Sequence, residues 1–172
     1  LFAGPVDVKT AQLIGEKFVR ANMETLRNFQ TTQHIGTWTD AKGTASLYIF
    51  NIDDKGFFIV SADDRAKPIL AFSDEGALDF NNIPSNMAYY LDRYTTAISF
   101  VVENNLEADA EVAEEWNLVK SRGIVTEKTL GRSVEPLINL LWNQDSPYNM
   151  YCPTAPGGPG GRAYVGCAAD AM

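Results

Sequence analysis

The chain has 172 residues, of which 45% are hydrophobic and 21% charged, a composition typical of a globular protein with a packed core. The net charge of -8 opposes contacts with nucleic-acid phosphates, and no apolar run approaches the ~18 residues of a membrane span, so we expect neither nucleic acid nor membrane as a partner. Two cysteines and one histidine are too few for a disulfide scaffold or a zinc cluster, so we expect no metal and no cofactor.

A first helix is predicted near the N-terminus. Asp7 is a good N-cap, because its carboxylate can accept hydrogen bonds from the unpaired N–H groups of a first turn. The apolar residues that follow at the spacing of one helix face are Ala11, Ile14, Phe18 and Ala21. Residues 23–43 are irregular and polar, so we expect no regular element there and interpret His34 as a surface histidine rather than a catalytic base.

Three strands of a small antiparallel sheet are predicted next. Residues 46–51 and 57–62 are rich in β-branched and aromatic side chains, and the acidic, glycine-containing stretch between them is typical of a hairpin turn. A third short strand covers residues 69–73. Asp63 and Asp64 could hold a metal, but without a third ligand we interpret them as part of a charged turn.

A second, longer helix follows the sheet. Pro84 suits a first helical position, and the helix then runs to about residue 105. Its predicted apolar face consists of Met87, Leu91, Tyr94, Ile98 and Val101. Residues 107–115 are acidic and helix-prone, and Trp116 and Leu118 can dock that segment on the rest of the protein. Together these elements predict an α+β fold, a small antiparallel sheet with packed helices.

A change of composition divides the chain. Residues around 120–132 are basic, glycine-spaced and poor in periodic apolar positions, as in exposed connectors where proteases cut. We therefore expect a compact domain over residues 1–120, a connector over residues 121–132 and a second part over residues 133–172. A loop rich in proline and glycine at residues 153–161 lacks the Gly-Lys-Ser/Thr ending of a phosphate-binding loop.

The second part ends in a glycine–cysteine pair. Gly166 directly precedes Cys167. We expect Cys167 to lie in the first turn of a helix, because the residues after it include alanine and methionine, which favour helices. The unpaired N–H groups and the positive dipole of a helix start would favour a reactive thiolate at that position. On these residues alone, however, a buried structural cysteine is the commoner outcome.

Separate stretches of the sequence resemble one known family. The sequence GFFIVSADDR at residues 56–65, continuing to PILAFS at residues 68–73, resembles the prodomain of the streptopain family of secreted bacterial cysteine peptidases. The sequences WNQDSPYN at residues 142–149 and GCAADAM at residues 166–172 resemble the start of that family's catalytic domain. Because the stretches occur in the family's order, they are more specific together than either is alone.

The resemblance implies a fold, an activity and a set of site residues. It implies an inhibitory prodomain followed by the first part of a papain-like catalytic domain, in a secreted or cell-surface zymogen that hydrolyses proteins and peptides. Cys167 matches the nucleophile, and Gln144 matches the side-chain donor of the oxyanion hole. Asn86 matches the prodomain asparagine that reaches the cleft of the zymogen's own catalytic domain, although a polar residue in a first helical turn is an equally good interpretation.

The sequence also departs from the family. Ala168 stands where the family has valine and Asp170 where it has threonine, and a carboxylate one turn from Cys167 opposes thiolate formation. The family's base is a histidine downstream of the cysteine, whereas no histidine follows Cys167 here. A Cys/His dyad cannot turn over without imidazole, so we expect these residues to be inactive alone and to be a fragment of a longer zymogen.

Two other functions remain open. The chain could be a stand-alone inhibitor of cysteine peptidases that resembles a prodomain. It could also be a binding module whose sheet merely resembles that of the prodomain. Cys167 and Gln144 argue against both, because neither function needs a nucleophile or an oxyanion donor.

Overall fold

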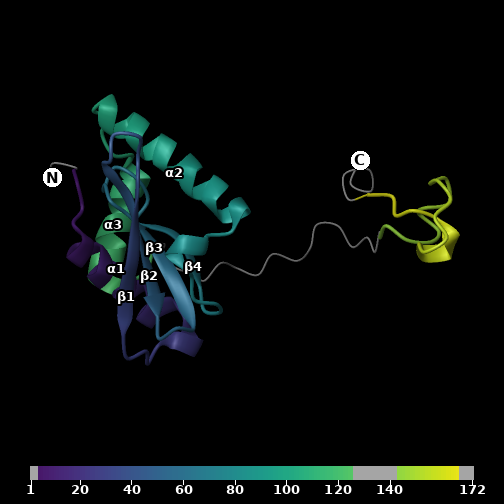
Figure 1. Cartoon of the computed structure of the whole chain (residues 1–172), viewed down its shortest axis with the longest axis horizontal. Coiled ribbons are helices and arrows are strands. Elements are labelled where there is room, and N and C mark those ends of the chain that lie inside the picture. Colours follow the sequence, from purple (N-terminus) through teal and green to yellow (C-terminus); the bar gives the residue numbers. More distant parts are fainter. Residues whose placement is uncertain (1–3, 126–142, 167–172) are drawn as a thin grey trace. The chain divides into compact units, whose positions relative to one another are not determined.

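The computed structural model describes residues 4–125 and 143–166. The chain divides into two compact units, Leu1–Lys128 and Thr129–Met172, which we call the N-terminal and C-terminal units (Figure 1). In the described residues, every helix and strand except one short 3-10 helix belongs to the N-terminal unit. None of the helices in these residues is long and apolar enough to cross a membrane.

Helix α1 (Val8–Asn22) begins where the sequence predicts. The Asp7 carboxylate accepts hydrogen bonds from the backbone N–H groups of Lys9 at 2.9 Å and Thr10 at 3.0 Å. The buried residues of α1 are Ala11, Ile14, Gly15, Phe18 and Val19. The prediction that Ala21 shares this face is wrong, because the helical repeat carries Ala21 to the edge of the face, where it is exposed.

Four antiparallel strands form one sheet in chain order, which confirms the predicted α+β class. They are β1 (Thr32–Thr39), β2 (Ala45–Ile52), β3 (Gly56–Ser61) and β4 (Ile69–Ser73). The prediction that residues 23–43 hold no regular element is wrong, because they contain β1. The pairing register of β1 shifts between His34 and Gly36, and this irregularity interrupts the alternation of polar and apolar residues that identifies a strand.

The hairpin between β2 and β3 depends on two aspartates. Asp53 and Asp54 have φ values of 45° and 54°, the left-handed region that tight hairpin turns require. The Asp53 carboxylate also accepts hydrogen bonds from the backbone N–H groups of Gln30 at 2.8 Å and Thr31 at 2.7 Å, which lower its pKa below the ordinary value. Asp53 thereby fixes the chain at the entry to β1.

Helices cover both faces of the sheet. Helix α1 packs against β3 and helix α2 (Ser85–Glu103) packs against β2, on opposite sides of the sheet (Figure 1). An apolar core lies on each face of the sheet, and strand β2 contributes side chains to both. Leu47 and Ile49 lie on the α2 side, and Phe50 and Ile52 lie on the α1 side. Because both of its faces are buried, β2 reads as a continuous apolar run in the sequence.

The predicted apolar face of α2 is confirmed at its centre and wrong at one position. Leu91 and Ile98 are buried, but Tyr94 is 38% exposed. The Tyr94 hydroxyl donates a hydrogen bond to the carbonyl of Leu70 at 3.4 Å, so this side chain lies against β4 instead of inside the core.

Helix α3 (Ala110–Arg122) completes the layer that contains α1. The Asp109 carboxylate accepts a hydrogen bond from the Glu111 N–H at 2.9 Å and caps the helix start. The Trp116 indole is buried and donates to the carbonyl of Ala66 at 2.7 Å. The predicted docking of this segment through Trp116 is confirmed.

The end of α3 is held against α1. The Lys17 ammonium donates to the carbonyl of Lys120 at 2.7 Å, and the Asn22 amide donates to the carbonyl of Gly123 at 2.7 Å. These bonds satisfy carbonyl groups that a helix end leaves unpaired. Helix α3 includes the first two residues of the connector expected over residues 121–132, and the later part of that connector lies outside the described residues.

Candidate functional site

The expected nucleophile follows directly after the last described residue. Cys167 itself lies outside the described residues, which end at Gly166. Gly166 has a φ of 92°, a conformation that residues with side chains rarely adopt. The backbone before Cys167 therefore requires the glycine that the sequence places there.

A hydrogen bond joins the segment before Cys167 to Gln144, the expected oxyanion donor. The backbone N–H of Val165 donates to the carbonyl of Gln144 at 3.2 Å, and the Gln144 residue is half-buried. Val165 lies two residues before Cys167 in the chain. The structure therefore brings Gln144 beside the segment that leads to the cysteine, although Gln144 and Val165 are 21 positions apart in the chain.

Asn149 is a residue that the sequence did not identify. Its side chain is buried, and its amide nitrogen donates to the carbonyls of Pro159 at 2.8 Å and Ala163 at 3.3 Å. Its backbone N–H donates to the carbonyl of Asp145 at 3.1 Å. Asn149 therefore links the turn after Gln144 to the loop that approaches Cys167.

The proline- and glycine-rich loop between these segments is compact. It contains the 3-10 helix η3 (Pro159–Gly161), and a Cβ added at Gly158 would lie 1.9 Å from the carbonyl oxygen of Arg162. The Arg162 guanidinium donates to the carbonyl of Cys152 at 2.8 Å. Cys152 is half-buried in this loop, which agrees with a packing role for its side chain.

In the N-terminal unit, the outward face of α2 is unusually aromatic. Tyr89, Tyr90 and Phe100 are 58%, 63% and 60% exposed. Asn86 and Arg93 lie on the same side of the helix, because the five positions 86, 89, 90, 93 and 100 are separated by three, four or seven residues, the spacings of one helix face. This side is opposite the buried face of α2. We call these five residues the aromatic face of α2. Large exposed apolar side chains that gather on one surface mark an interaction site.

Asn86 lies at the start of this aromatic face. It occupies the first turn of α2 and is exposed. Its carboxamide has no hydrogen-bond partner within residues 4–125 and 143–166. The side chain is therefore available for contact with another surface.

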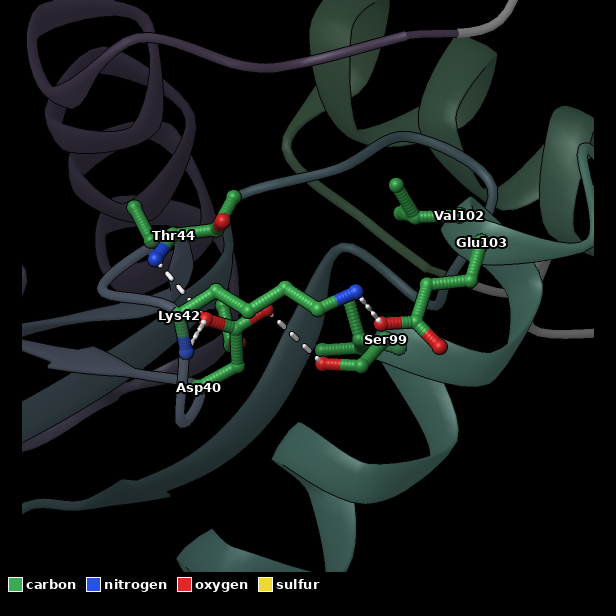
Figure 2. Close-up of a pocket in the computed structure, with 9 residues that line it drawn as sticks. Asp40, Lys42, Thr44, Ser99, Val102 and Glu103 are labelled. Atoms are coloured by element: carbon green, nitrogen blue, oxygen red, sulfur yellow. Dashed lines mark hydrogen bonds and ion pairs between the residues drawn. The ribbon is translucent and has the colours of Figure 1, made fainter.

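A cavity of about 200 Å³ lies between the end of α2 and the turn that joins β1 to β2 (Figure 2). Figure 2 shows the side chain of Lys42 reaching Glu103 and that of Asp40 pointing to Ser99 of α2. The Asp40 carboxylate accepts hydrogen bonds from the N–H groups of Thr44 and Lys42, both at 2.8 Å, which lower its pKa. The hydrogen bond to Glu103 raises the pKa of Lys42. Because the charged and polar side chains that line this cavity bond to one another across it, we interpret it as a contact between α2 and the turn.

The aspartates after β3 have structural partners. Asp63 is buried and forms an ion pair with Arg65 at 2.8 Å. The Asp64 carboxylate accepts a hydrogen bond from the N–H of Gly4 at 2.6 Å. In residues 4–125 and 143–166, no three His, Cys, Asp or Glu side chains lie close enough together to hold a metal ion.

Two relatives align with large parts of the chain. The thiol protease/hemagglutinin PrtT of Porphyromonas gingivalis is 26% identical over 183 aligned residues, which cover all of this chain and 20% of that protein. Streptopain of Streptococcus pyogenes is 28% identical over 123 aligned residues, which cover 71% of this chain and 28% of streptopain. The chain therefore spans less than a third of the length of either relative.

A family model matches a stretch that lies within the N-terminal unit. Residues 3–98, more than half of the chain, match the family described as Spi protease inhibitor. This stretch contains the sheet and most of α2, including Asn86. The chain belongs to the Spi protease inhibitor family and contains a streptopain-family prodomain.

Proposed function

We propose that these residues are the N-terminal part of the zymogen of a secreted bacterial cysteine endopeptidase. The observation that carries the proposal is the extent of the alignment with the PrtT thiol protease, which covers this whole chain and so includes the segment that ends with Cys167. An inhibitor module alone would not need that segment to align with a protease.

Peptide hydrolysis in this proposal uses Cys167 and Gln144. The Cys167 thiolate attacks the carbonyl carbon of the substrate and forms a C–S bond, while the carbonyl oxygen becomes an oxyanion. The side-chain amide of Gln144 donates a hydrogen bond to that oxyanion. A histidine from outside these residues takes the thiol proton and gives it to the leaving amine as the oxyanion collapses and the C–N bond breaks. Water then attacks the resulting thioester, breaks the C–S bond and releases the acid product and the Cys167 thiol, so the reaction needs no cofactor. The hydrogen bond between Val165 and Gln144 supports the assignment, because it joins the two segments that carry the reacting groups.

Inhibition in this proposal uses the N-terminal unit. The aromatic face of α2 packs on the zymogen's own papain-like catalytic domain, and Asn86 reaches the substrate cleft. The exposed rings of Tyr89, Tyr90 and Phe100 support this assignment, because buried aromatic side chains dominate the binding energy of protein interfaces. Cleavage of the connector after α3 then releases the enzyme.

Substitution of the two cysteines tests the catalytic assignment. In the full-length gene product, Cys167→Ala should lower peptide hydrolysis at least about 1,000-fold, because it removes the nucleophile. Gln144→Ala should lower kcat about 100-fold or more, because it removes an oxyanion donor. Cys152→Ala is the matched control and should keep nearly the wild-type rate. Full activity in Cys167→Ala, or its loss in Cys152→Ala, would contradict the assignment.

A second function, a stand-alone inhibitor of other cysteine peptidases, has one observation in its favour. The family model stops at residue 98, inside the N-terminal unit, and this unit contains both apolar cores of the described structure. Such an inhibitor would slow a streptopain-like peptidase but would hydrolyse no peptide itself. The cysteine variants above therefore distinguish the two functions.

A further inference from the structure

The described part of the C-terminal unit, residues 143–166, is organised around a polar side chain. Among residues 143–166, Asn149 alone is buried, with 2% of its surface exposed. The residues around it include the exposed side chains of Tyr148, Met150 and Tyr151. Hydrogen bonds rather than apolar packing therefore hold this stretch together.

The bonds of Asn149 match the chemistry of a primary amide. A carboxamide nitrogen carries two hydrogens, so it can donate to two carbonyl oxygens at once, here those of Pro159 and Ala163. Alanine would leave both carbonyls without this donor. Aspartate has the same shape but, when ionised, would present oxygen atoms to two carbonyl oxygens and repel them.

These bonds lie next to the bond that joins Val165 to Gln144. The segment before Cys167 is held at Ala163 and at Val165. The Ala163 carbonyl accepts from the Asn149 side chain, the Ala163 N–H donates to the carbonyl of Pro153 at 3.0 Å, and the Val165 N–H donates to the carbonyl of Gln144. Asn149 is also linked to the turn after Gln144 through its own N–H and the carbonyl of Asp145. Without the Asn149 side chain, the bond from Val165 to Gln144 would be the one described bond that joins residues 163–165 directly to the turn at residues 144–149.

We infer that Asn149 is a positioning residue for the proposed peptidase site. Its carboxamide sets the register of residues 163–165 against the turn that carries Gln144, and so orients the oxyanion donor relative to the segment that leads to the nucleophile. This inference rests on the proposed function. It requires a strong effect on catalysis, because a displacement of about 1 Å in a catalytic group can cost about 100-fold in rate.

The test compares variants of the full-length protein after activation. Asn149→Ala and Asn149→Asp should each lower kcat by about 10- to 100-fold, with KM changed less than about 3-fold. Tyr151→Ala is the matched control, since Tyr151 lies two residues away and is 92% exposed, and it should match the wild type. On acidification, Asn149→Asp should regain part of its kcat relative to the wild type, because a protonated carboxyl can donate to one carbonyl.

Two further measurements separate positioning from a general loss of structure. The rate of Cys167 alkylation by iodoacetamide should stay within about 3-fold of the wild type in Asn149→Ala, because alkylation forms no oxyanion for Gln144 to stabilise. In a Gln144→Ala background, Asn149→Ala should lower kcat by no more than about 3-fold, because the donor that it positions is already absent.

Several results would overturn the inference. Wild-type kcat in both Asn149 variants would do so, and so would full additivity with Gln144→Ala or a loss of alkylation that parallels the loss of kcat. If Asn149→Asp does not fold, Asn149→Ser replaces it, and its single hydroxyl donor should give a kcat between those of alanine and asparagine. An inactive wild type, or an active Cys167→Ala, would instead refute the proposed function, and the inference would fall with it.

Discussion

At the scale of single residues, two glycines in the left-handed region have different surroundings. Gly123 ends α3 with a φ of 74°, and a Cβ there would lie 2.4 Å from the carbonyl oxygen of Lys17. Gly43 has a φ of 80° but has open space around it. Gly43→Ala should therefore cost about 1 kcal/mol of unfolding free energy, from the backbone conformation alone. Gly123→Ala should cost about 2–3 kcal/mol, because α3 must also move from α1. Urea unfolding measures both costs, and equal values would show that the contact with α1 is unimportant.

Three carboxylates make the stability of the N-terminal unit depend on pH. Hydrogen bonds lower the pKa of Asp7, mainly from the Thr10 hydroxyl, and those of Asp40 and Asp53, mainly from the N–H groups of Thr44 and Gln30. A lowered folded pKa adds stability that is complete above the ordinary value of 3.8 and is lost as the pH falls through the folded value.

Acid should therefore destabilise the prodomain, and the aspartates should account for part of the loss. Between about pH 5 and about pH 2, the unfolding free energy should fall, and Asp53→Asn should lose less over this range than the wild type. Chemical unfolding at a series of pH values makes the comparison. Glu75→Gln is a suitable control, because Glu75 is exposed at a turn. Identical slopes for the wild type and Asp53→Asn would argue that this carboxylate has no part in the acid response.

At the scale of elements, α2 has a buried face and an exposed face, so a substitution can alter one without the other. Its inner face, with Leu91 and Ile98, belongs to the core, whereas Tyr89 and Phe100 on its outer face are exposed. Replacing both exposed rings with serine should change the unfolding free energy by less than about 1 kcal/mol. The same change should weaken inhibition of the mature peptidase at least about 10-fold, because the rings would be buried in that interface. The control, Leu13→Ser, alters a 62% exposed side chain on α1. Equal inhibition by the wild type, the double serine variant and Leu13→Ser would show that these rings of α2 are not part of the interface.

The sequence predicted the elements that have a strong local signal. Helices α1 and α2 lie close to their predicted positions because their apolar faces repeat with the helical period. Strands β2, β3 and β4 do so because they are short runs rich in β-branched and aromatic residues, bounded by turn residues. Strand β1 was not predictable in this way, since it lies at the edge of the sheet and has a register shift. Its structure depends on pairing with β2, and this contact cannot be predicted from the residues of β1 alone.

The candidate site was predictable to a different extent. Cys167, Gln144 and Asn86 were identified from their positions in family motifs, and the geometry adds the link between Gln144 and the segment before Cys167. Asn149 lies in one of those motifs, but no periodic pattern marks it. Its role depends on carbonyls 10 and 14 residues further along the chain, which only the folded structure brings close to it.

At the scale of the whole molecule, the chain has two units, to which the proposed function assigns different roles. The N-terminal unit has its own cores and matches an inhibitor family, whereas the C-terminal unit contains the expected start of an enzyme. The alignments cover 20% of PrtT and 28% of streptopain, so the histidine that the proposal requires has room in the unmatched part of such a protein. We propose that the N-terminal unit keeps this enzyme inactive until the connector is cut.

The most direct test follows intact mass and peptidase activity together in the full-length protein over time. Activity should appear in the wild type as the protein loses the mass of the N-terminal unit. The Cys167→Ala variant should keep its full mass and remain inactive. Adding the separate N-terminal unit at about micromolar concentration should then suppress the activated enzyme. Equal activity before and after the loss of mass, with no suppression by the added unit, would contradict the account.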